Sequence, residues 1–280
     1  MPDLLTMQNV VVLFVLSVLA GLLAIAPTSA RAGVVPGGIL TVPLPSGFSG
    51  ATFGGRRVLI RGQTAVIGIG LDIKPGSHTL VFNGASGASQ AARDFVFAVE
   101  SKTYPEQRLQ IANQKMVNPD PKALKRIEAE AKRMEAVYMS FTPGPPPTAF
   151  DKPLQGRISS PFGFRRVFNG EPRNPHSGLD IAAPTGTPVP SPAAGTVVLT
   201  GNFYFNGNSV FVDHSQGFIT MVCHLSTIDV LDGQKINAGD ILGKVGATGR
   251  ATGPHLHWSV SLNGYRVEPD EAIRIFSSGK

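Results

Sequence analysis

The sequence has a single cysteine, Cys223, among 280 residues. An intramolecular disulfide is therefore excluded, and a stable fold must depend on an apolar core or on a bound metal ion. Charged residues are also scarce, at 16%, whereas 32 glycines and 23 prolines are present. This composition favours short strands joined by many turns over long helices. A hydrophobic content of 42% argues against an intrinsically disordered chain.

The N-terminus carries an apolar run, Val10–Ala26, which is followed by small residues. The pattern Ala30-x-Ala32 is an acceptable cleavage site, so we predict that residues 1–32 are a secretory signal and that the mature chain begins at Gly33. No Lys or Arg precedes the run, so an uncleaved membrane anchor is the alternative, because about 17–25 apolar residues can span a bilayer. Both interpretations place residues 33–280 in the periplasm or cell envelope.

Clusters of basic residues interleaved with aromatic ones are missing as well, although the formal net charge is +6. Their absence argues against nucleic acid as a partner. A basic exported protein is instead attracted to anionic polymers, such as those of the cell wall.

Changes in composition divide the rest of the chain into three parts. Residues 33–100 contain β-branched and aromatic runs separated by turn residues, which predicts a small β domain. Residues 101–153 contain a helix and a proline-rich spacer, Pro143–Pro147, and form a linker. Residues 154–280 return to strand-like runs without helical periodicity, which predicts an antiparallel sheet. The expected fold class is mainly β, with an N-terminal small β domain, a helical linker and a C-terminal antiparallel β-sheet domain.

The helix of the linker is predicted to start with Asp120 as N-cap and Pro121 as first helical residue. Apolar residues then recur at spacings of three and four, at Leu124, Ile127, Ala131, Met134 and Tyr138. Such a stripe is typical of an amphipathic helix that packs against one of the two domains.

Five of the six histidines lie in the C-terminal part. His255 and His257 are two residues apart, so on a strand both imidazoles lie on one face. His176 and Asp180 lie in a loop or at a strand entry, between Pro175 and Pro184. Two imidazoles and a carboxylate suit zinc, and three protein ligands with an open fourth position are typical of a catalytic zinc site.

The other candidate residues have simpler interpretations. Cys223 and His224 are adjacent, so on a strand they point to opposite faces; this excludes a catalytic Cys–His pair and predicts an inert buried thiol. His214 is predicted to be a turn residue, with a place in the site as the alternative. His78 is predicted to be an ordinary strand residue. Gly68-Ile-Gly70 is not a dinucleotide fingerprint, because no third glycine opens a helix after it.

An ordered series of motifs extends beyond the histidines. It runs Ser160-Pro-Phe-Gly-Phe-Arg-Arg, His176-Ser-Gly-Leu-Asp180, Gly186-Thr-Pro-Val-Pro, Ala194-Gly-Thr-Val, Val212-Asp-His-Ser-Gln-Gly-Phe, Cys223-His224-Leu-Ser, Val245-Gly-Ala-Thr-Gly and Thr252-Gly-Pro-His255-Leu-His257-Trp. In this order the motifs resemble the lysostaphin/LytM-type zinc metallopeptidases, which cut peptide cross-links in peptidoglycan. The resemblance covers about residues 155–270.

The resemblance implies a zinc-dependent endopeptidase whose substrate is peptidoglycan and whose nucleophile is a zinc-bound water. His176, Asp180 and His257 would hold the Zn²⁺ ion, and His224 and His255 would be catalytic, helping to deprotonate the water and to stabilise the oxyanion. The core would be a groove-forming antiparallel sheet with the metal on its floor. Many members of the family have a tyrosine where this chain has Val222.

Three residues near the motifs, Arg165, Arg166 and Arg173, are expected to be solvated or to meet carboxylates of the substrate. The proline spacer would also allow the N-terminal domain to lie across the groove and restrain the enzyme. An envelope regulatory protein is a further expected partner. Two alternatives to the enzyme remain: a non-enzymatic envelope module that activates another cell-wall hydrolase, and a structural envelope protein in which metal braces the fold.

Overall fold

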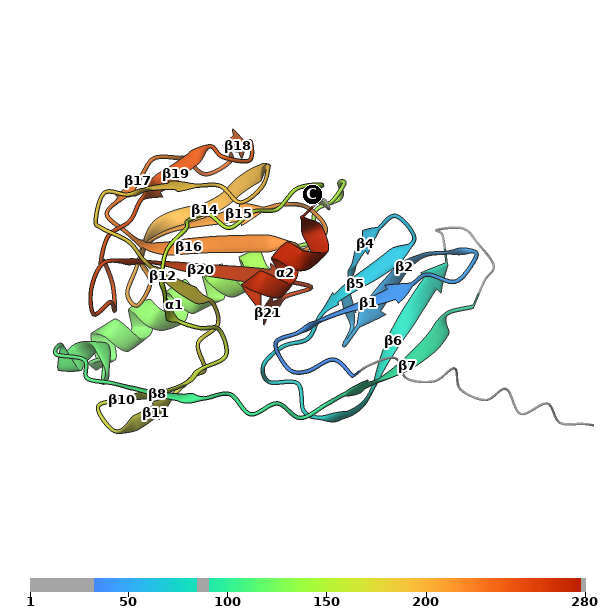
Figure 1. Cartoon of the computed structure of the whole chain (residues 1–280), viewed down its shortest axis with the longest axis horizontal. Coiled ribbons are helices and arrows are strands. Elements are labelled where there is room, and N and C mark those ends of the chain that lie inside the picture. Colours follow the sequence, from blue (N-terminus) through green and yellow to red (C-terminus); the bar gives the residue numbers. More distant parts are fainter. Residues whose placement is uncertain (1–32, 85–90, 278–280) are drawn as a thin grey trace, which may run out of the picture.

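The computed structural model describes residues 33–84 and 91–277. The predicted secretory signal, residues 1–32, lies outside the described residues. Within the described part of the chain, no helix is long and apolar enough to cross a membrane. The architecture is mainly β, with small N-terminal sheets, one long helix and a large C-terminal antiparallel sheet (Figure 1), which confirms the predicted fold class.

Two small antiparallel sheets form the N-terminal part. The first has the order β1-β5-β4 and the second β3-β2-β6-β7. Their strands are β1 (Ile39–Pro43), β2 (Phe48–Phe53), β3 (Arg56–Arg57), β4 (Leu59–Arg61), β5 (Thr64–Gly68), β6 (Gly76–Gly84) and β7 (Arg93–Val99). Alternate residues such as Leu80 and Phe82 of β6 are buried, and they pack with Phe53 and Phe97 in one apolar cluster. His78 is a residue of β6, as predicted.

The large C-terminal sheet has the order β18-β14-β15-β16-β20-β12-β9, with β21 also paired to β20, and a smaller sheet has the order β13-β19-β17. The strands are β9 (Ile158–Ser160), β12 (Leu179–Ala182), β13 (Pro188–Pro190), β14 (Gly195–Phe203), β15 (Gly207–Asp213), β16 (Ile219–Leu225), β17 (Thr227–Ile228), β18 (Lys235–Ile236), β19 (Ile241–Lys244), β20 (His255–Leu262) and β21 (Tyr265–Val267). Leu256, Trp258, Val260 and Leu262 of β20 are fully buried in the main core. Their neighbours in the sequence therefore lie on the opposite face of the sheet.

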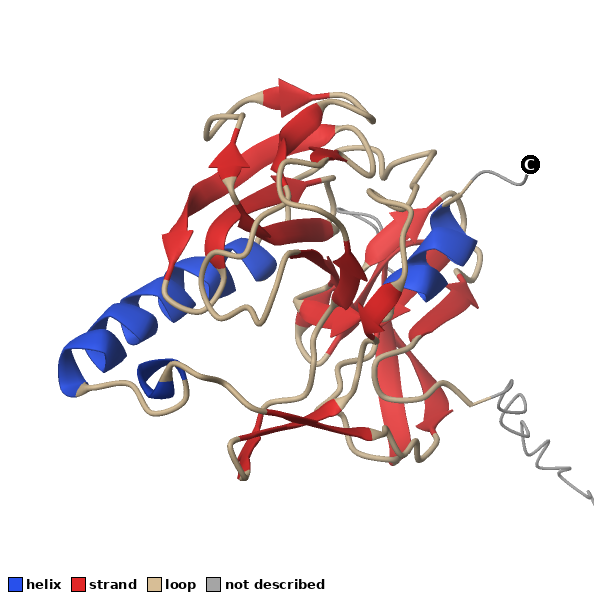
Figure 2. Ribbon diagram, turned by 60° about the vertical axis from the view of Figure 1, so that its left-hand side comes forward, coloured by secondary structure: helices blue, strands red, loops and turns tan. Residues whose placement is uncertain are grey.

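The long helix, α1 (Pro121–Tyr138), starts where the sequence predicts, and the Asp120 side chain accepts a hydrogen bond of 2.8 Å from the Ala123 amide. Its apolar stripe is buried only at the C-terminal end, where Met134 and Tyr138 pack on the large sheet. Leu124 is 46% exposed, and Ala131 is exposed too, so this half of the predicted stripe is wrong. Polar bonds replace apolar contacts there, from Arg126 to the Asn202 carbonyl and from the Tyr204 amide to Glu130. Helices α1 and α2 (Pro269–Phe276) flank the strands on two sides (Figure 2).

The segment before α1 also joins the C-terminal part. β8 (Glu106–Leu109) pairs in parallel with β10 (Arg165–Phe168), which in turn pairs with β11 (Glu171–Arg173). The following 3₁₀ turn, η1 (Gln114–Met116), leads from this hairpin to the N-cap of α1. The linker is therefore built into the same structure as the strands it precedes.

The N-terminal sheets dock on the far end of β20. The Asn263 side chain accepts from the Gly68 amide at 2.7 Å and donates to the Gly68 carbonyl at 3.1 Å, replacing a missing strand partner. Gly68 has to be glycine, because a Cβ there would lie 2.8 Å from the Leu262 carbonyl oxygen. Ile39, Leu59 and Val66 belong to the same core cluster as Leu262 and Phe276.

This docking corrects the hypothesis that the N-terminal domain lies across the groove. Asn263 follows the end of β20, whereas the histidine pair stands at its beginning. Six residues of extended strand between His257 and Asn263 correspond to roughly 20 Å. The apolar surface of the N-terminal sheets packs against the C-terminal end of β20, and burial of this surface stabilises the contact.

Candidate metal centre

Three predicted residues converge at one point of the large sheet. β12 and β20 are antiparallel neighbours with Asp180 directly opposite His257, so the two side chains share a face. His257 Nδ1 lies 2.8 Å from Asp180 Oδ1. His176, in the loop before β12, places Nε2 3.0 Å from the same carboxylate oxygen and 3.0 Å from His257 Nδ1. All three side chains are buried.

The remaining ring nitrogens have partners of their own, which fixes what the converging atoms can do. His176 Nδ1 donates to the Pro161 carbonyl at 2.8 Å, because a carbonyl can only accept, and the neutral ring then presents a lone pair at Nε2. His257 Nε2 lies 2.9 Å from the Ser259 hydroxyl oxygen, which can accept a hydrogen bond from a proton on that nitrogen. Two imidazole lone pairs and a carboxylate oxygen then face one another.

Such a set fits a metal ion. The facing atoms of His176, Asp180 and His257 all lie within 4.8 Å of one another. Electron pairs that repel one another at this range are stabilised by a cation between them, and two imidazole nitrogens with one carboxylate oxygen suit zinc. Burial lowers the pKa of His176 to about 4, so its ring is in the neutral form that binds metal. Burial alone would raise the pKa of Asp180, but the two histidines outweigh it and hold this pKa well below its usual range.

A second pair of histidines borders the first group. The rings of His224 and His255 have their centroids 4.8 Å apart, and the His224 ring lies 6.1 Å from that of His257. His224 Nδ1 donates to the Thr248 carbonyl at 2.7 Å, and His255 Nδ1 donates to the Gly253 carbonyl at 2.8 Å. Each neutral ring therefore keeps a lone pair at Nε2. Burial, followed by the nearby His257 and His255, lowers the pKa of His224 to about 3.

His224 reaches this face through a β-bulge. Along β16, Val222 pairs with Val210 and Leu225 with Asn208, so β16 carries one extra residue. His224 takes a left-handed backbone conformation, with φ of 62°. Its ring thus lies beside His255 and His257 instead of following the alternation of the strand.

The bulge overturns one prediction about Cys223. Cys223 lies directly opposite His257 across β16 and β20, so it shares the face of the metal centre, and the prediction that Cys223 and His224 point to opposite faces is wrong. The thiol is 1% exposed in the cluster beneath α1, and burial raises its pKa. A thiol in this environment is not a nucleophile, in agreement with the expected inert side chain.

Arg166, predicted to be solvated or to meet a substrate carboxylate, instead binds the carboxylate of Asp180. Its Nη2 donates to Asp180 Oδ2 at 2.9 Å and to the Ser160 hydroxyl at 3.3 Å, with 18% of the side chain exposed. Arg165 is exposed and pairs with Glu106, and Arg173 bonds Glu171. The alternation of β10 could have indicated this, because neighbouring arginines on a strand face opposite sides.

Gly178 allows the loop before β12 to pack on the site. A Cβ at this position would lie 2.6 Å from His257 Nε2 and 2.5 Å from the Trp258 carbonyl oxygen. Any other residue would push the loop, and His176 with it, away from His257.

The other predicted candidates lie outside the site. His214 follows β15 as expected of a turn residue, but it is buried and bonds the Ala194 carbonyl and the Thr220 hydroxyl, so it supports the core and does not line the groove. Val222 is 1% exposed within the main core. A side chain at this position therefore does not line the groove in this chain.

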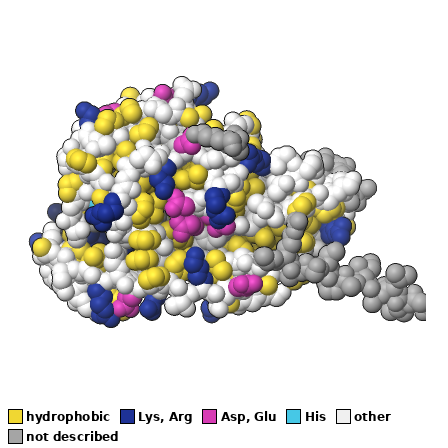
Figure 3. Space-filling view, viewed as in Figure 1, with side chains coloured by type: hydrophobic (Ala, Val, Ile, Leu, Met, Phe, Trp, Pro, Cys, Tyr) yellow, Lys and Arg dark blue, Asp and Glu magenta, His cyan; other side chains and the backbone are white. Residues whose placement is uncertain are grey.

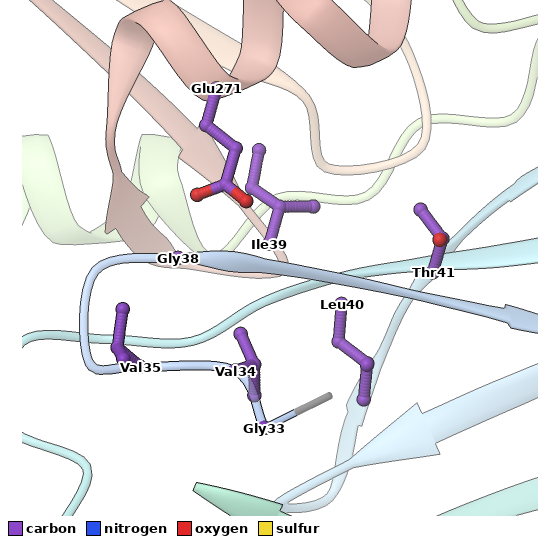
Figure 4. A pocket seen from close by; sticks show the side chains of 8 residues that line it. All are labelled: Gly33, Val34, Val35, Gly38, Ile39, Leu40, Thr41 and Glu271. Atoms are coloured by element: carbon purple, nitrogen blue, oxygen red, sulfur yellow. The ribbon is translucent and has the colours of Figure 1, made fainter. Parts of the chain in front are cut away.

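One cavity away from the metal centre carries few groups that could do chemistry. A cavity of about 440 Å³ lies beside α2 (Figure 4), but its only ionisable side chain is Glu271 and the others are apolar or Thr41. Lys and Arg side chains are scattered over the face in Figure 3 among neutral and apolar ones, without a continuous basic stripe.

Comparisons with known proteins agree with this geometry. Residues 174–269 match the model of peptidase family M23. A crystal structure of a Pseudomonas aeruginosa protein assigned to peptidase M23 is 45% identical, has a TM-score of 0.70, and covers 86% of this chain and 96% of that one.

Two curated relatives match part of the chain. DD-carboxypeptidase/endopeptidase Mpg of Neisseria meningitidis is 42% identical over 40% of this chain and 26% of its own length. Peptidoglycan DD-endopeptidase ShyA of Vibrio cholerae is 44% identical over 41% of this chain and 27% of its own length. The chain thus spans about a quarter of the length of these relatives.

Proposed function

Because the chain belongs to peptidase family M23, we propose that it is a zinc-dependent endopeptidase that hydrolyses peptide cross-links of peptidoglycan. The observation that carries the proposal is the convergence of His176, Asp180 and His257 beside two further imidazoles. The relatives named as a DD-carboxypeptidase/endopeptidase and as a peptidoglycan DD-endopeptidase support the substrate class.

His176, Asp180 and His257 would hold the zinc, through Nε2, Oδ1 and Nδ1. When bound, zinc supplies a Lewis acid that polarises the scissile carbonyl and lowers the pKa of water. Arg166 holds the second oxygen of Asp180, so the carboxylate keeps one orientation. Such supporting contacts set the geometry and affinity of metal ligands.

His224 and His255 would handle the proton. In the neutral form of each ring the proton is on Nδ1, where it is donated to a backbone carbonyl, so the Nε2 lone pair is free to accept a proton from the attacking water. The ring that accepts it becomes an imidazolium, which stabilises the developing oxyanion and returns the proton to the leaving amine. His255 is the less buried of the two rings, and its Nε2 lies 3.9 Å from Asp180 Oδ1, which favours it as the first acceptor.

The non-enzymatic alternatives have less support. A module that only activates another hydrolase does not need two further imidazoles beside a metal-binding set, and a metal that only braces the fold does not need them either. The proposed location is the periplasm or cell envelope, where peptidoglycan lies, with export through residues 1–32.

Turnover of purified sacculi tests the function. Protein stripped of metal with a chelator should release no soluble peptides, and added zinc should restore release. The Asp180→Ala variant should be inactive at any zinc concentration, whereas His78→Ala, a distant histidine change, should match the wild type. Hydrolysis by Asp180→Ala at the wild-type rate would refute the proposal.

A further inference from the structure

Arg250 stands on the loop that orients one of the two proton-handling histidines. Its amide donates to the Phe205 carbonyl at 2.8 Å, and two residues earlier the Thr248 carbonyl accepts from His224 Nδ1. The same short loop therefore fixes the His224 ring and carries a guanidinium group that lies over Phe168, the ring that Arg166 of the metal centre also contacts.

Aromatic rings hold this guanidinium in place. Its carbon lies 4.1 Å from the ring centroid of Phe205 and 4.9 Å from that of Phe168, and Nη1 donates to the Met116 carbonyl at 3.2 Å. Cation–π contacts of this kind stabilise the charge without neutralising it. One of its five N–H donors is used by Met116, so others remain for a ligand.

No carboxylate neutralises Arg250. Among residues 33–84 and 91–277, none forms an ion pair with it within 4.0 Å. Burial, followed by the like charges of Arg166 and Arg173, lowers the pKa of Arg250 to about 10. At neutral pH the group is still fully protonated. Arg166 lies against the same Phe168 ring, 5.8 Å from its centroid, and reaches Asp180 from there.

The metal centre therefore has an excess of positive charge. Arg173 is paired with Glu171 at 2.8 Å, which leaves Arg166 and Arg250 against the single carboxylate of Asp180. A divalent ion between the ligands increases this excess. Binding of a neutral amide does not require this excess of positive charge. Binding of a carboxylate next to the amide does, because complementary charge lowers the cost of desolvating the carboxylate.

We propose that Arg250 is a specificity-determining residue that binds a free carboxylate of the substrate, on a residue adjoining the scissile amide. This inference rests on the proposed endopeptidase function. A peptide cross-link made through a side-chain amine leaves the α-carboxylate of that residue free, so such cross-links offer the required anion. Substrates in which the carboxylate is converted to an amide bind less tightly.

Two synthetic cross-linked peptides test this inference, identical except that one carries the carboxylate and the other a carboxamide. Binding is measured by fluorescence anisotropy with zinc-loaded protein carrying His255→Ala, which prevents turnover. Adding Arg250→Gln should raise the Kd of the carboxylate peptide about tenfold or more, as expected for loss of a charge-assisted hydrogen bond, and leave that of the carboxamide peptide within about twofold. Arg250→Lys keeps the charge but not the planar fork, so its effect should be intermediate.

A matched control is Arg133→Gln, which removes another guanidinium that lies over an aromatic ring, 5.5 Å from the Phe203 centroid, on the exposed side of α1. It should change neither Kd. Equal weakening of both peptides by Arg250→Gln, or of neither, would overturn the inference. If Arg250→Gln does not fold, the test uses only the protein that keeps Arg250. This protein must bind the carboxylate peptide more tightly than the carboxamide peptide, and the difference in Kd must shrink as salt is added. Equal affinity for both peptides overturns the inference.

Steady-state cleavage separates this inference from the proposed function. With the carboxylate peptide, Arg250→Gln should raise KM and leave kcat nearly unchanged, the pattern of lost uniform binding. If zinc-loaded wild type cleaves neither peptide nor sacculi, the endopeptidase function fails. If it cleaves both peptides with the same KM, the function stands and the role of Arg250 is rejected.

Discussion

The His224 and His255 rings lie with their centroids 4.8 Å apart, and each is anchored by its own Nδ1 to a backbone carbonyl. The two imidazoles are therefore neighbours whose neutral forms both present a lone pair at Nε2. A proton on one ring disfavours a proton on the other, because two like charges at this distance repel. The pair is suited to accept one proton and release it again.

Substitutions of the five site residues should separate into two groups. Asp180→Ala and His257→Ala each remove one proposed ligand, so both should lower the zinc content of purified protein. His224→Ala and His255→Ala should retain zinc but lose activity on sacculi by about 10²–10⁴-fold, the usual contribution of a general acid–base group. Metal analysis by mass spectrometry, alongside sacculus turnover, measures both effects. Full zinc in Asp180→Ala would contradict the ligand assignment.

Arg166→Gln should weaken metal binding without removing a ligand. The loss frees Asp180 Oδ2, and supporting contacts of this type are worth about 10–100-fold in metal affinity. Competition with a calibrated zinc chelator gives the affinity. Arg165→Gln is the control, since that neighbour is exposed and points elsewhere. Equal affinities for the two variants would mean that Arg166 does not position the carboxylate.

A fragment starting at Thr148 should be less stable than the 33–280 chain. It lacks Ile39, Leu59 and Val66, which share the core with Leu262 and Phe276, and it also lacks α1 and β8, so it exposes apolar surface that the full chain buries. We expect a lower melting temperature and aggregation on heating, followed by light scattering. A fragment that melts at the same temperature as the full chain would show that residues 33–147 contribute nothing to its stability.

Stability should fall as the pH drops through the range set by His214. Burial lowers its pKa from 6.5 to about 4, so the folded state keeps the ring neutral while the unfolded state binds a proton below pH 6.5. The full contribution is present above pH 6.5 and is lost toward pH 4, by about 2.5 kcal/mol between pH 7 and 4.5. Urea unfolding at the two pH values measures the loss. The loss of unfolding free energy between the two pH values should be smaller by about 2.5 kcal/mol in His214→Gln and unchanged in His78→Gln. If both variants lose as much as the wild type, His214 is not the group responsible.

The mature chain should begin at Gly33, because Ala30-x-Ala32 is the best processing site in the sequence. N-terminal sequencing of protein from the envelope fraction identifies the first residue. An intact Met1 in the membrane fraction would instead establish the uncleaved anchor.

Local patterns carried the predictions that hold. The spacing of His255 and His257 placed both rings on one face of β20, and Asp120 followed by Pro121 gave the start of α1. Both depend only on residues that are close in the sequence. The meeting of His176 with the other ligands was implied by the family resemblance, and could not be worked out from spacing.

The failures arose where distant parts of the chain decide. Cys223 and His224 share a face because β16 has one residue more than its neighbour, which no local pattern reveals. Leu124 stays exposed because α1 extends beyond the sheet that covers Tyr138. The docking of the N-terminal sheets depends on Asn263 and Gly68, which are far apart in the sequence and whose contact has no separate signal in either segment.

The bulge in β16 makes the active site sensitive to the length of this strand. Deleting one residue between Val222 and Leu225 would restore regular pairing with β15 and remove the bulge that brings the His224 ring beside His255 and His257. Inserting one residue would enlarge the bulge and displace the His224 ring as well. Changes of side chain in this strand can leave its geometry intact, but small insertions and deletions cannot, so this stretch should vary among relatives by substitution and not in length.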